Sequence, residues 1–93
     1  MKATLNDQVV ADSADVVQLG GYAYFPRAAV KMNWLQQAPK TASDLECPHG
    51  VQFYDVVIDG ARHERVAWSY EAPKPAMRTI AHHIGFWNDV QVN

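Results

Sequence analysis

Two apolar runs joined by Asp59-Gly60 constrain the fold of this chain more than any other feature. The first run, VQFYDVVI, covers residues 51–58, and the second, ARHERVAWSY, covers residues 61–70. Asp-Gly is typical of a type I′ turn, because both central residues of that turn need a positive φ angle. The segment therefore predicts an antiparallel β-hairpin, with Ile58 directly opposite Ala61.

The same two-residue turn sets the register of the whole hairpin. It places Phe53 opposite Val66 and Asp55 opposite Glu64. Two like charges directly across a strand pair are unfavourable, unless Arg62 lies diagonal to them and offsets the repulsion. The predicted register therefore contains one local conflict, at Asp55.

Turn signals divide the first 25 residues into further short strands. Asn6-Asp7 interrupts a strand between residues 4 and 11. Gly20-Gly21 is a strong two-residue hairpin signal and predicts that residues 16–19 pair with residues 22–25. Pro26 ends this second hairpin, because proline lacks the N–H that a ladder needs.

Helical patterns are weak. Residues 27–38 (RAAVKMNWLQQA) match the helical period only in part, so we expect a turn or two of helix, followed by a polar connector over residues 40–46. Pro75 favours a short helix through Ile80, because proline is tolerated at the first helical position. The last segment, residues 82–92, predicts closing strands with a turn at Asn88-Asp89.

Composition limits the class of protein. The chain has 93 residues, which predicts a single domain spanning 1–93, and its net charge is −2. The eight Lys and Arg residues are scattered, which argues against a nucleic-acid surface. No apolar stretch approaches the roughly 20 residues that cross a bilayer, and the N-terminus does not read as a secretory leader. We therefore expect a cytoplasmic domain with no nucleic acid, membrane or cofactor partner.

The cysteine count limits the stabilising chemistry. Cys47 is the only cysteine. A disulfide within the chain and a Cys₄ or Cys₂His₂ zinc knuckle are therefore excluded, and a reducing compartment is expected.

The order of motifs along the whole chain resembles one known family. The segments MKATLNDQVVADS, YFPRAAV, CPHG leading into FYDVVIDG, VAWSYEAPKPA and GFWNDVQV are similar to the family of domains of unknown function DUF427. Its members are small, largely bacterial proteins without an established activity, and the family carries an automatic nucleotidyltransferase label. It has no agreed catalytic residues, so the resemblance transfers none. His49 stands where the family tends to have a Trp-Lys pair.

The resemblance implies a mainly β architecture. The expected fold is a β-tent (Mss4-like), in which two antiparallel sheets meet at an angle and one or two short helical turns are added. Relatives of that fold, including the B-type methionine sulfoxide reductases, often hold a structural zinc on paired CxxC knuckles. This chain has no such knuckles, so the resemblance implies that aromatic packing replaces the metal.

Cys47 and His49 are the candidate catalytic residues. A thiolate needs a lowered pKa, which a nearby cation such as His49 could provide. Two alternatives stay open: a small buried hydrophobic side chain at Cys47, and a mixed metal site formed by Cys47, His49 and His83. The site prediction itself includes no metal.

The acidic residues of the hairpin do not fit a shared metal. Asp55 and Asp59 are about 13 Å apart along a strand at ~3.3 Å per residue, whereas carboxylates that share one Mg²⁺ lie within roughly 4–5 Å. Asp59 is better explained as a turn residue. Asp55 is expected either to pair with an arginine or to line a ligand cleft, since a buried unpaired carboxylate is costly.

An aromatic set predicts a ligand cleft between the two sheets. The set comprises Tyr24, Tyr54, Trp68, Tyr70 and Trp87. Aromatic side chains at the mouth of a cleft can bind a flat ligand while their polar ends stay hydrated. Arg27 would anchor a carboxylate or phosphate beside them.

Three functions follow from these observations. The leading prediction is a domain that binds a small polar or anionic molecule in a cleft lined by Tyr54, Asp55, Trp68 and residues 47–50, with Tyr24 and Arg27 nearby. The first alternative is an enzyme in which Cys47 carries out redox or nucleophilic chemistry. The second is a structural or interaction domain that forms a homodimer through exposed strand edges.

Overall fold

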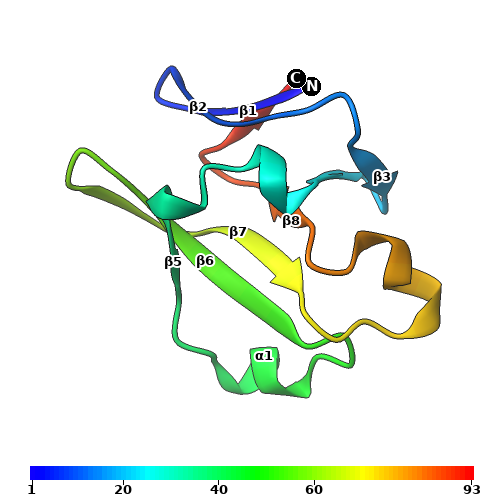
Figure 1. Cartoon of the computed structure of the whole chain (residues 1–93). Helices are drawn as coiled ribbons and strands as arrows, with labels where there is room; N and C mark the ends of the chain where they lie inside the picture. The colour runs from blue at the N-terminus through cyan, green and yellow to red at the C-terminus, as the bar shows by residue number, and fades with distance from the viewer.

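The computed structural model describes residues 1–93 and is mainly β, as predicted (Figure 1). The strands are β1 (Lys2–Leu5), β2 (Gln8–Asp12), β3 (Val17–Leu19), β4 (Tyr22–Phe25), β5 (Leu35–Gln37), β6 (Val51–Ile58), β7 (Ala61–Tyr70), β8 (Ile84–Phe86) and β9 (Gln91–Val92). The helical segments are η1 (Arg27–Ala29), η2 (Met32–Trp34), α1 (Ala42–Glu46) and η3 (Pro75–Ile80).

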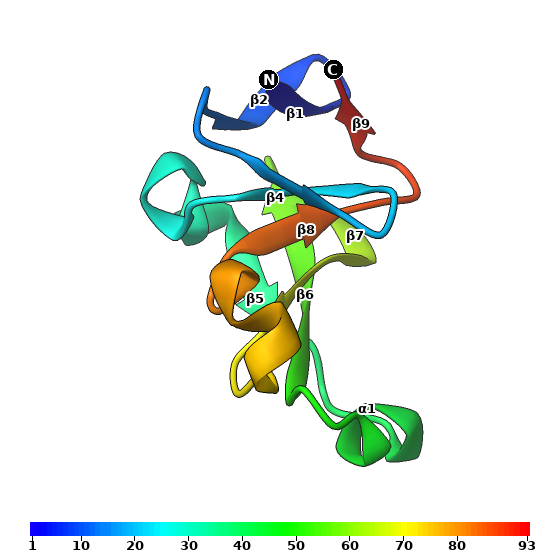
Figure 2. The same cartoon turned by 90° about the vertical axis from the view of Figure 1, so that its right-hand side faces the viewer.

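The strands form two antiparallel sheets. The smaller sheet has the order β2-β1-β9, and the larger has the order β3-β4-β8-β7-β6-β5. The smaller sheet lies across one end of the larger, and both chain termini belong to it (Figure 2). Both sheets are open, so each has two edge strands.

The main core fills the space between the sheets. Leu5 and Val10 of the smaller sheet and Phe25, Val56 and Ile84 of the larger are completely buried in it. This packing corrects the expectation of a ligand cleft between the sheets. Only a small pocket of about 140 Å³ remains there, between the β1–β2 and β6–β7 turns.

The opposite face of the six-stranded sheet, which we call the outer face, carries a second cluster. Its buried members are Tyr24, Val51, Trp68 and Ile80. Side chains alternate between the two faces of a strand, so Ala67 of β7 belongs to the main core and the next residue, Trp68, to the outer face. The largest pocket of the molecule lies on this outer face.

The central hairpin forms as predicted at its turn. Asp59 and Gly60 have φ angles of 51° and 81°, which a type I′ turn requires. Ile58 pairs with Ala61, also as predicted.

Further from the turn, the predicted register is wrong. Phe53 pairs with Trp68, not with Val66, because the register shifts between Tyr54 and Val56. A β-bulge on β7 takes up the extra residues, and Arg65 adopts a left-handed φ of 53° within it. Asp55 therefore does not face Glu64. Its carboxylate accepts the backbone N–H of Arg65 at 3.0 Å instead, so the bulge removes the predicted conflict.

The connections between strands differ more from the sequence predictions. Residues 27–38, where a turn or two of helix is expected, form the short turns η1 and η2 and then strand β5. The expected connector over residues 40–46 contains α1. This helix begins with a capping box, in which the Thr41 and Asp44 side chains each accept the other's backbone N–H. The short helix from Pro75 to Ile80 is confirmed, and no helix is long and apolar enough to cross a membrane.

Candidate functional site

An aromatic pocket of about 320 Å³ lies on the outer face of the six-stranded sheet. Eight of its nine lining residues are hydrophobic. The lining comprises Leu19, Gly20, Tyr22, Tyr24, Phe53, Trp68, Tyr70, Met77 and Trp87. No charged side chain is among them. We call this the aromatic pocket.

Strand geometry brings these residues together. Tyr22 and Tyr24 are two positions apart on β4, and Trp68 and Tyr70 are two positions apart on β7. Each pair therefore points to one face of the sheet. Phe53 joins them from β6, because the bulge sets it opposite Trp68. The helix η3 adds Met77 at the rim.

Trp68 forms the floor of the pocket and contacts the surrounding rings mostly edge to face. Its ring centroid lies 5.0 Å from that of Tyr22, 5.9 Å from Tyr24 and 5.2 Å from Trp87. These arrangements match the preferred geometry of aromatic pairs, which bring a ring edge to a ring face. Because Trp68 is only 4% exposed, the rings around it fix its position.

Gly85 provides the space in which the indole of Trp68 lies. Gly85 of β8 pairs with Trp68 across the ladder. A Cβ atom at Gly85 would lie 2.8 Å from Cε2 and Cζ2 of Trp68 and 3.0 Å from Cε1 of Tyr24. Only a residue without a side chain therefore fits beneath this ring.

One buried polar group of the aromatic pocket lacks a hydrogen-bond partner. The Trp68 indole N–H is buried without an acceptor of normal geometry, whereas the Trp87 indole N–H donates to the Arg65 carbonyl. Burial and the nearby Tyr70 phenol raise the pKa of Tyr24 to about 12, although the Trp68 N–H near its hydroxyl opposes this slightly. Tyr24 is therefore a neutral phenol at physiological pH.

Phe53 and Trp87 form one wall of the aromatic pocket. Their rings are stacked, with an interplanar angle of 28° and centroids 5.9 Å apart. The guanidinium of Arg65 lies 4.0 Å from the Phe53 ring centroid. The Trp87 indole N–H donates to the Arg65 carbonyl at 2.6 Å. Arg65 thus contacts both members of this wall.

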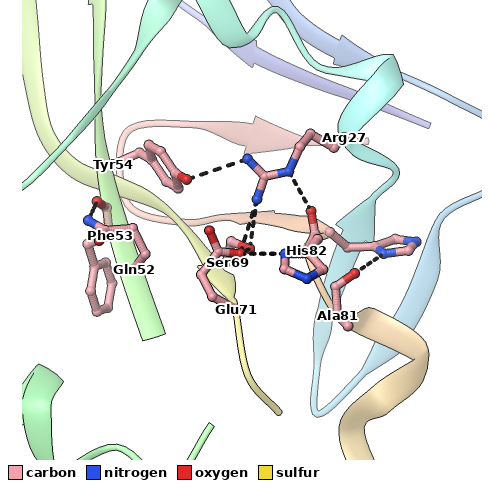
Figure 3. Close-up of polar contacts among 9 residues, drawn as sticks. Arg27, Gln52, Phe53, Tyr54, Ser69, Glu71, Ala81 and His82 are labelled. Carbon is pink, nitrogen blue, oxygen red and sulfur yellow. Dashed lines mark hydrogen bonds and ion pairs between the residues drawn. The ribbon is translucent and has the colours of Figure 1, made fainter. Parts of the chain in front are cut away.

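A polar cluster around Arg27 lies on the opposite face of the sheet, beside the main core (Figure 3). Arg27 donates from Nη2 to Ser69 Oγ at 3.1 Å and to Glu71 Oε2 at 3.3 Å, and from Nε to the His82 carbonyl at 3.0 Å. Its Nη1 also reaches the Tyr54 hydroxyl at 3.5 Å. The predicted site residues Arg27 and Tyr54 therefore meet here, and not in the aromatic pocket.

Glu71 is the centre of this cluster. Its Oε2 accepts the Ser69 hydroxyl at 2.8 Å and lies 2.9 Å from Nδ1 of His82, as Figure 3 shows. Partial burial opposes ionisation of the carboxyl. The hydrogen bonds from Ser69 and His82 and the charge of Arg27 outweigh it, so the pKa of Glu71 lies below its usual value. With its groups bound to one another, the cluster ties η1 to the end of β7.

The two predicted catalytic residues, Cys47 and His49, make no hydrogen bond to each other. Cys47 ends α1, is half-buried and packs against the outer-face cluster. His49 Nδ1 accepts the backbone N–H of Lys74 at 3.0 Å. The His49 and Tyr70 rings pack edge to face, with their centroids 5.6 Å apart. No hydrogen bond links Cys47 to His49. No group of three or more His, Cys, Asp or Glu side chains is arranged to hold a metal, so Cys47, His49 and His83 do not form one.

Asp55 is paired on the outer face, next to the bulge. One carboxylate oxygen accepts from Arg62 at 2.7 Å and the other from the Arg65 backbone at 3.0 Å. Both oxygens thus have partners, and Asp55 does not line the aromatic pocket. Asp59, four residues away, lies in the hairpin turn.

Among the predicted ligand-binding residues, the structure places Tyr24 and Trp68 together in the aromatic pocket. It also places there Tyr70 and Trp87, which belonged to the predicted aromatic set. The sequence reasoning missed Leu19, Gly20, Tyr22, Phe53 and Met77. The alternation of Tyr22 with Tyr24 could have revealed Tyr22, but nothing local to Leu19 or Met77 indicates that they face Trp68.

A comparison with known families supports the resemblance seen in the motifs. A family model described as a domain of unknown function (DUF427), whose short name denotes a nucleotidyltransferase, matches residues 1–93. No curated protein matches the chain.

Proposed function

The chain belongs to the DUF427 family of domains of unknown function, and from the geometry of its outer face we propose that it binds a small planar molecule in the aromatic pocket. The ligand is a ring system that lies against Trp68 and carries a polar substituent. The substituent reaches the phenol groups of Tyr24 and Tyr70. Binding, not covalent chemistry, is the function that this arrangement supports best.

One observation carries the proposal: exposed apolar surface is concentrated at the mouth of this pocket. The chain has five large hydrophobic residues that are exposed, and three of them, Leu19, Tyr22 and Trp87, line it. Exposed apolar groups that gather around one concave surface are typical of binding sites, whereas isolated ones are ordinary. A ligand that covers them would remove this surface from water.

The lining indicates the chemistry of the ligand. No charged side chain lines the pocket, and burying an unpaired charge is costly, so the ring portion is uncharged. The polar side-chain groups of the lining belong to tyrosine and tryptophan, and the buried Trp68 indole N–H among them makes no hydrogen bond. The polar or anionic group expected from the sequence therefore belongs on a substituent at the mouth, where phenol hydroxyls can donate to it.

A pair of matched probes tests the proposal. β-Naphthol is planar, whereas decahydro-β-naphthol has the same hydroxyl on a saturated skeleton. We expect β-naphthol to raise the melting temperature and to release heat on titration. A Trp34→Phe background leaves Trp68 and Trp87 as the two tryptophans of the chain. The saturated probe should bind more weakly, because it lacks edge-to-face contacts.

Two serine substitutions locate the binding. Tyr22 is 40% exposed and lines the pocket, whereas Leu45 is 72% exposed and lies on α1 outside it. Tyr22→Ser should weaken β-naphthol binding, and Leu45→Ser should not. Cys47→Ser should also bind normally, which separates a binding domain from a cysteine-dependent enzyme. Equal loss in the Tyr22 and Leu45 variants, or no binding by the unmodified chain, contradicts the proposal.

A further inference from the structure

Arg65 is the residue that joins the wall of the aromatic pocket to the rest of the fold. Its guanidinium lies over Phe53 at 4.0 Å, and its carbonyl accepts the Trp87 indole N–H at 2.6 Å. Both rings line the pocket. A single residue therefore holds one ring through its side chain and the other through its backbone.

The Arg65 side chain is fixed from the other end by α1. Nη1 and Nη2 donate to the two carboxylate oxygens of Asp44 at 3.0 Å and 2.9 Å. Bidentate pairing of this kind fixes the plane of a guanidinium as well as its position. Asp44 is only 5% exposed and is itself held by the capping box with Thr41. The guanidinium is thus held over Phe53 by a buried anchor.

The backbone of Arg65 is also in an unusual state. Its φ of 53° lies in the left-handed region, which is unfavourable for a residue with a side chain. The Arg65 N–H donates to Asp55, and its carbonyl binds Trp87. This conformation turns the carbonyl toward the indole, so the strained backbone serves the position of the ring.

Building on the binding function proposed above, we propose that Arg65 is a positioning residue that sets the geometry of the Phe53–Trp87 wall and thereby makes the pocket select planar ligands. The two rings are within 28° of parallel. Stacked in this way, they form an ordered wall beside the Trp68 ring, which each of them contacts. Without the guanidinium, Phe53 can rotate and Trp87 loses its fixed stacking partner, and the pocket then accepts a thicker, saturated ligand almost as well as a flat one.

Arg62 provides a matched control on the same strand. It pairs with Asp55 at 2.7 Å and with Gln36 at 2.8 Å, but it does not line the pocket. Loss of Arg62 removes one arginine and one ion pair, as loss of Arg65 does. It leaves the contacts to Phe53 and Trp87 in place. A purely structural role predicts similar effects for the two substitutions, and a positioning role predicts different ones.

The experiment compares Arg65→Asn with Arg62→Asn in the Trp34→Phe background. Asparagine is chosen because it tolerates a left-handed backbone better than most residues. The first readout needs no ligand: acrylamide quenching of tryptophan emission should increase about twofold in Arg65→Asn and stay unchanged in Arg62→Asn. Only the first substitution frees Phe53 from the guanidinium and so loosens the Trp87 ring stacked on it. The second readout is the ratio of β-naphthol to decahydro-β-naphthol affinity. It should fall at least about threefold in Arg65→Asn only.

Arg65→Lys and Asp44→Asn extend the test if Arg65→Asn folds poorly. Lysine keeps the charge but cannot form the bidentate pair, and Asp44→Asn removes the anchor and keeps Arg65. Both substitutions should lower the ratio of β-naphthol to decahydro-β-naphthol affinity, but less than Arg65→Asn does. Unchanged quenching and an unchanged ratio in these variants overturn the proposal.

The two readouts also separate this inference from the proposed function. If the unmodified chain binds neither probe, the binding function fails, and quenching alone decides the role of Arg65. If acrylamide quenching then increases only in the Arg65 and Asp44 variants, this supports the proposal that Arg65 positions the Phe53–Trp87 wall. Equal quenching in the Arg65 and Arg62 variants overturns it.

Discussion

At Gly85, the absence of a side chain decides where an indole ring can lie. The six-membered part of Trp68 lies against the Gly85 backbone, and a Cβ there would overlap Cε2 and Cζ2 at 2.8 Å. Gly85 has no positive φ angle, unlike the four other glycines. It is therefore required by the space that Trp68 occupies and not by the backbone conformation.

We predict that Gly85→Ala destabilises the protein by ~1–3 kcal/mol, the usual cost of forcing extra atoms into a packed site. Urea unfolding measures this loss. In a Trp68→Phe background, the same substitution should cost clearly less, because phenylalanine lacks the second ring that the methyl group meets. An equal cost in both backgrounds would show that the clash with Trp68 is not the cause.

At the scale of elements, α1 depends on one carboxylate for its attachment to the sheet. Asp44 accepts two hydrogen bonds from Arg65 and one from the Thr41 backbone. The Arg65 guanidinium is the main reason that the pKa of Asp44 falls from 3.8 to about 2, although burial opposes the shift. A helix of five residues is too short to be stable by itself, so this attachment holds it in place.

The stability provided by Asp44 should therefore depend on pH. A carboxyl group with a lowered folded-state pKa contributes stability above its unfolded value and loses it as the pH falls toward the folded value. The free-energy difference between the unmodified chain and Asp44→Asn should be constant above about pH 5 and shrink as the pH falls from 3.8 to about 2. Denaturant midpoints across this range measure it.

The same substitution at exposed Asp7 controls for the loss of one carboxylate. Asp7 lies in the β1–β2 turn and has a positive φ angle that asparagine also tolerates. Its effect should be small and should not show the acid-dependent change expected for Asp44. A parallel pH profile for the two variants argues against the Asp44–Arg65 pair as its source.

Elements whose signals are local could be predicted from the sequence. The turns at Gly20-Gly21 and Asp59-Gly60 were predicted because the residues that need positive φ angles lie in the turn itself. α1 was missed although Thr41 and Asp44 have capping-box spacing, because the polar stretch around them has no helical apolar pattern.

Features that depend on distant residues could not be predicted. The bulge at Arg65 is held by Asp55, Asp44 and Trp87 together, and these residues are far apart in the sequence. The two-residue turn therefore predicts the wrong pairing of β6 with β7 on the far side of the bulge. The predicted aromatic set contains Tyr24, Trp68, Tyr70 and Trp87 of the aromatic pocket. The cleft was expected between the sheets, because the sequence does not show which face of the larger sheet the smaller one covers.

At the scale of the whole molecule, the smaller sheet joins the two ends of the chain. Lys2 and Asn93 exchange backbone hydrogen bonds of 2.8 and 2.9 Å, and β9 pairs with β1. Val92 packs against the main core next to the fully buried Ala3. Local contacts can form the β1–β2 hairpin but not the β1–β9 pair, which must assemble after the chain has folded back on itself.

Deletion of residues 91–93 should therefore lower stability without removing the aromatic pocket. We expect a loss of about 1–3 kcal/mol from the β9 hydrogen bonds and Val92 burial, measured by thermal or urea unfolding. β-Naphthol affinity at a temperature where the protein stays folded should be unchanged, because the pocket lies on the other face of the larger sheet. Removal of Asn93 alone should have a smaller effect. A shortened chain as stable as the original would contradict this account of the sheet.

The last residues of strand β7 contribute side chains to both faces of the larger sheet. Trp68 and Tyr70 face the aromatic pocket, while Ser69 and the following Glu71 face Arg27. Replacing a side chain alters one face and spares the other. Any substitution that shifts the β7 backbone here would displace Trp68 and Ser69 together, because neighbouring residues of one strand serve the two faces.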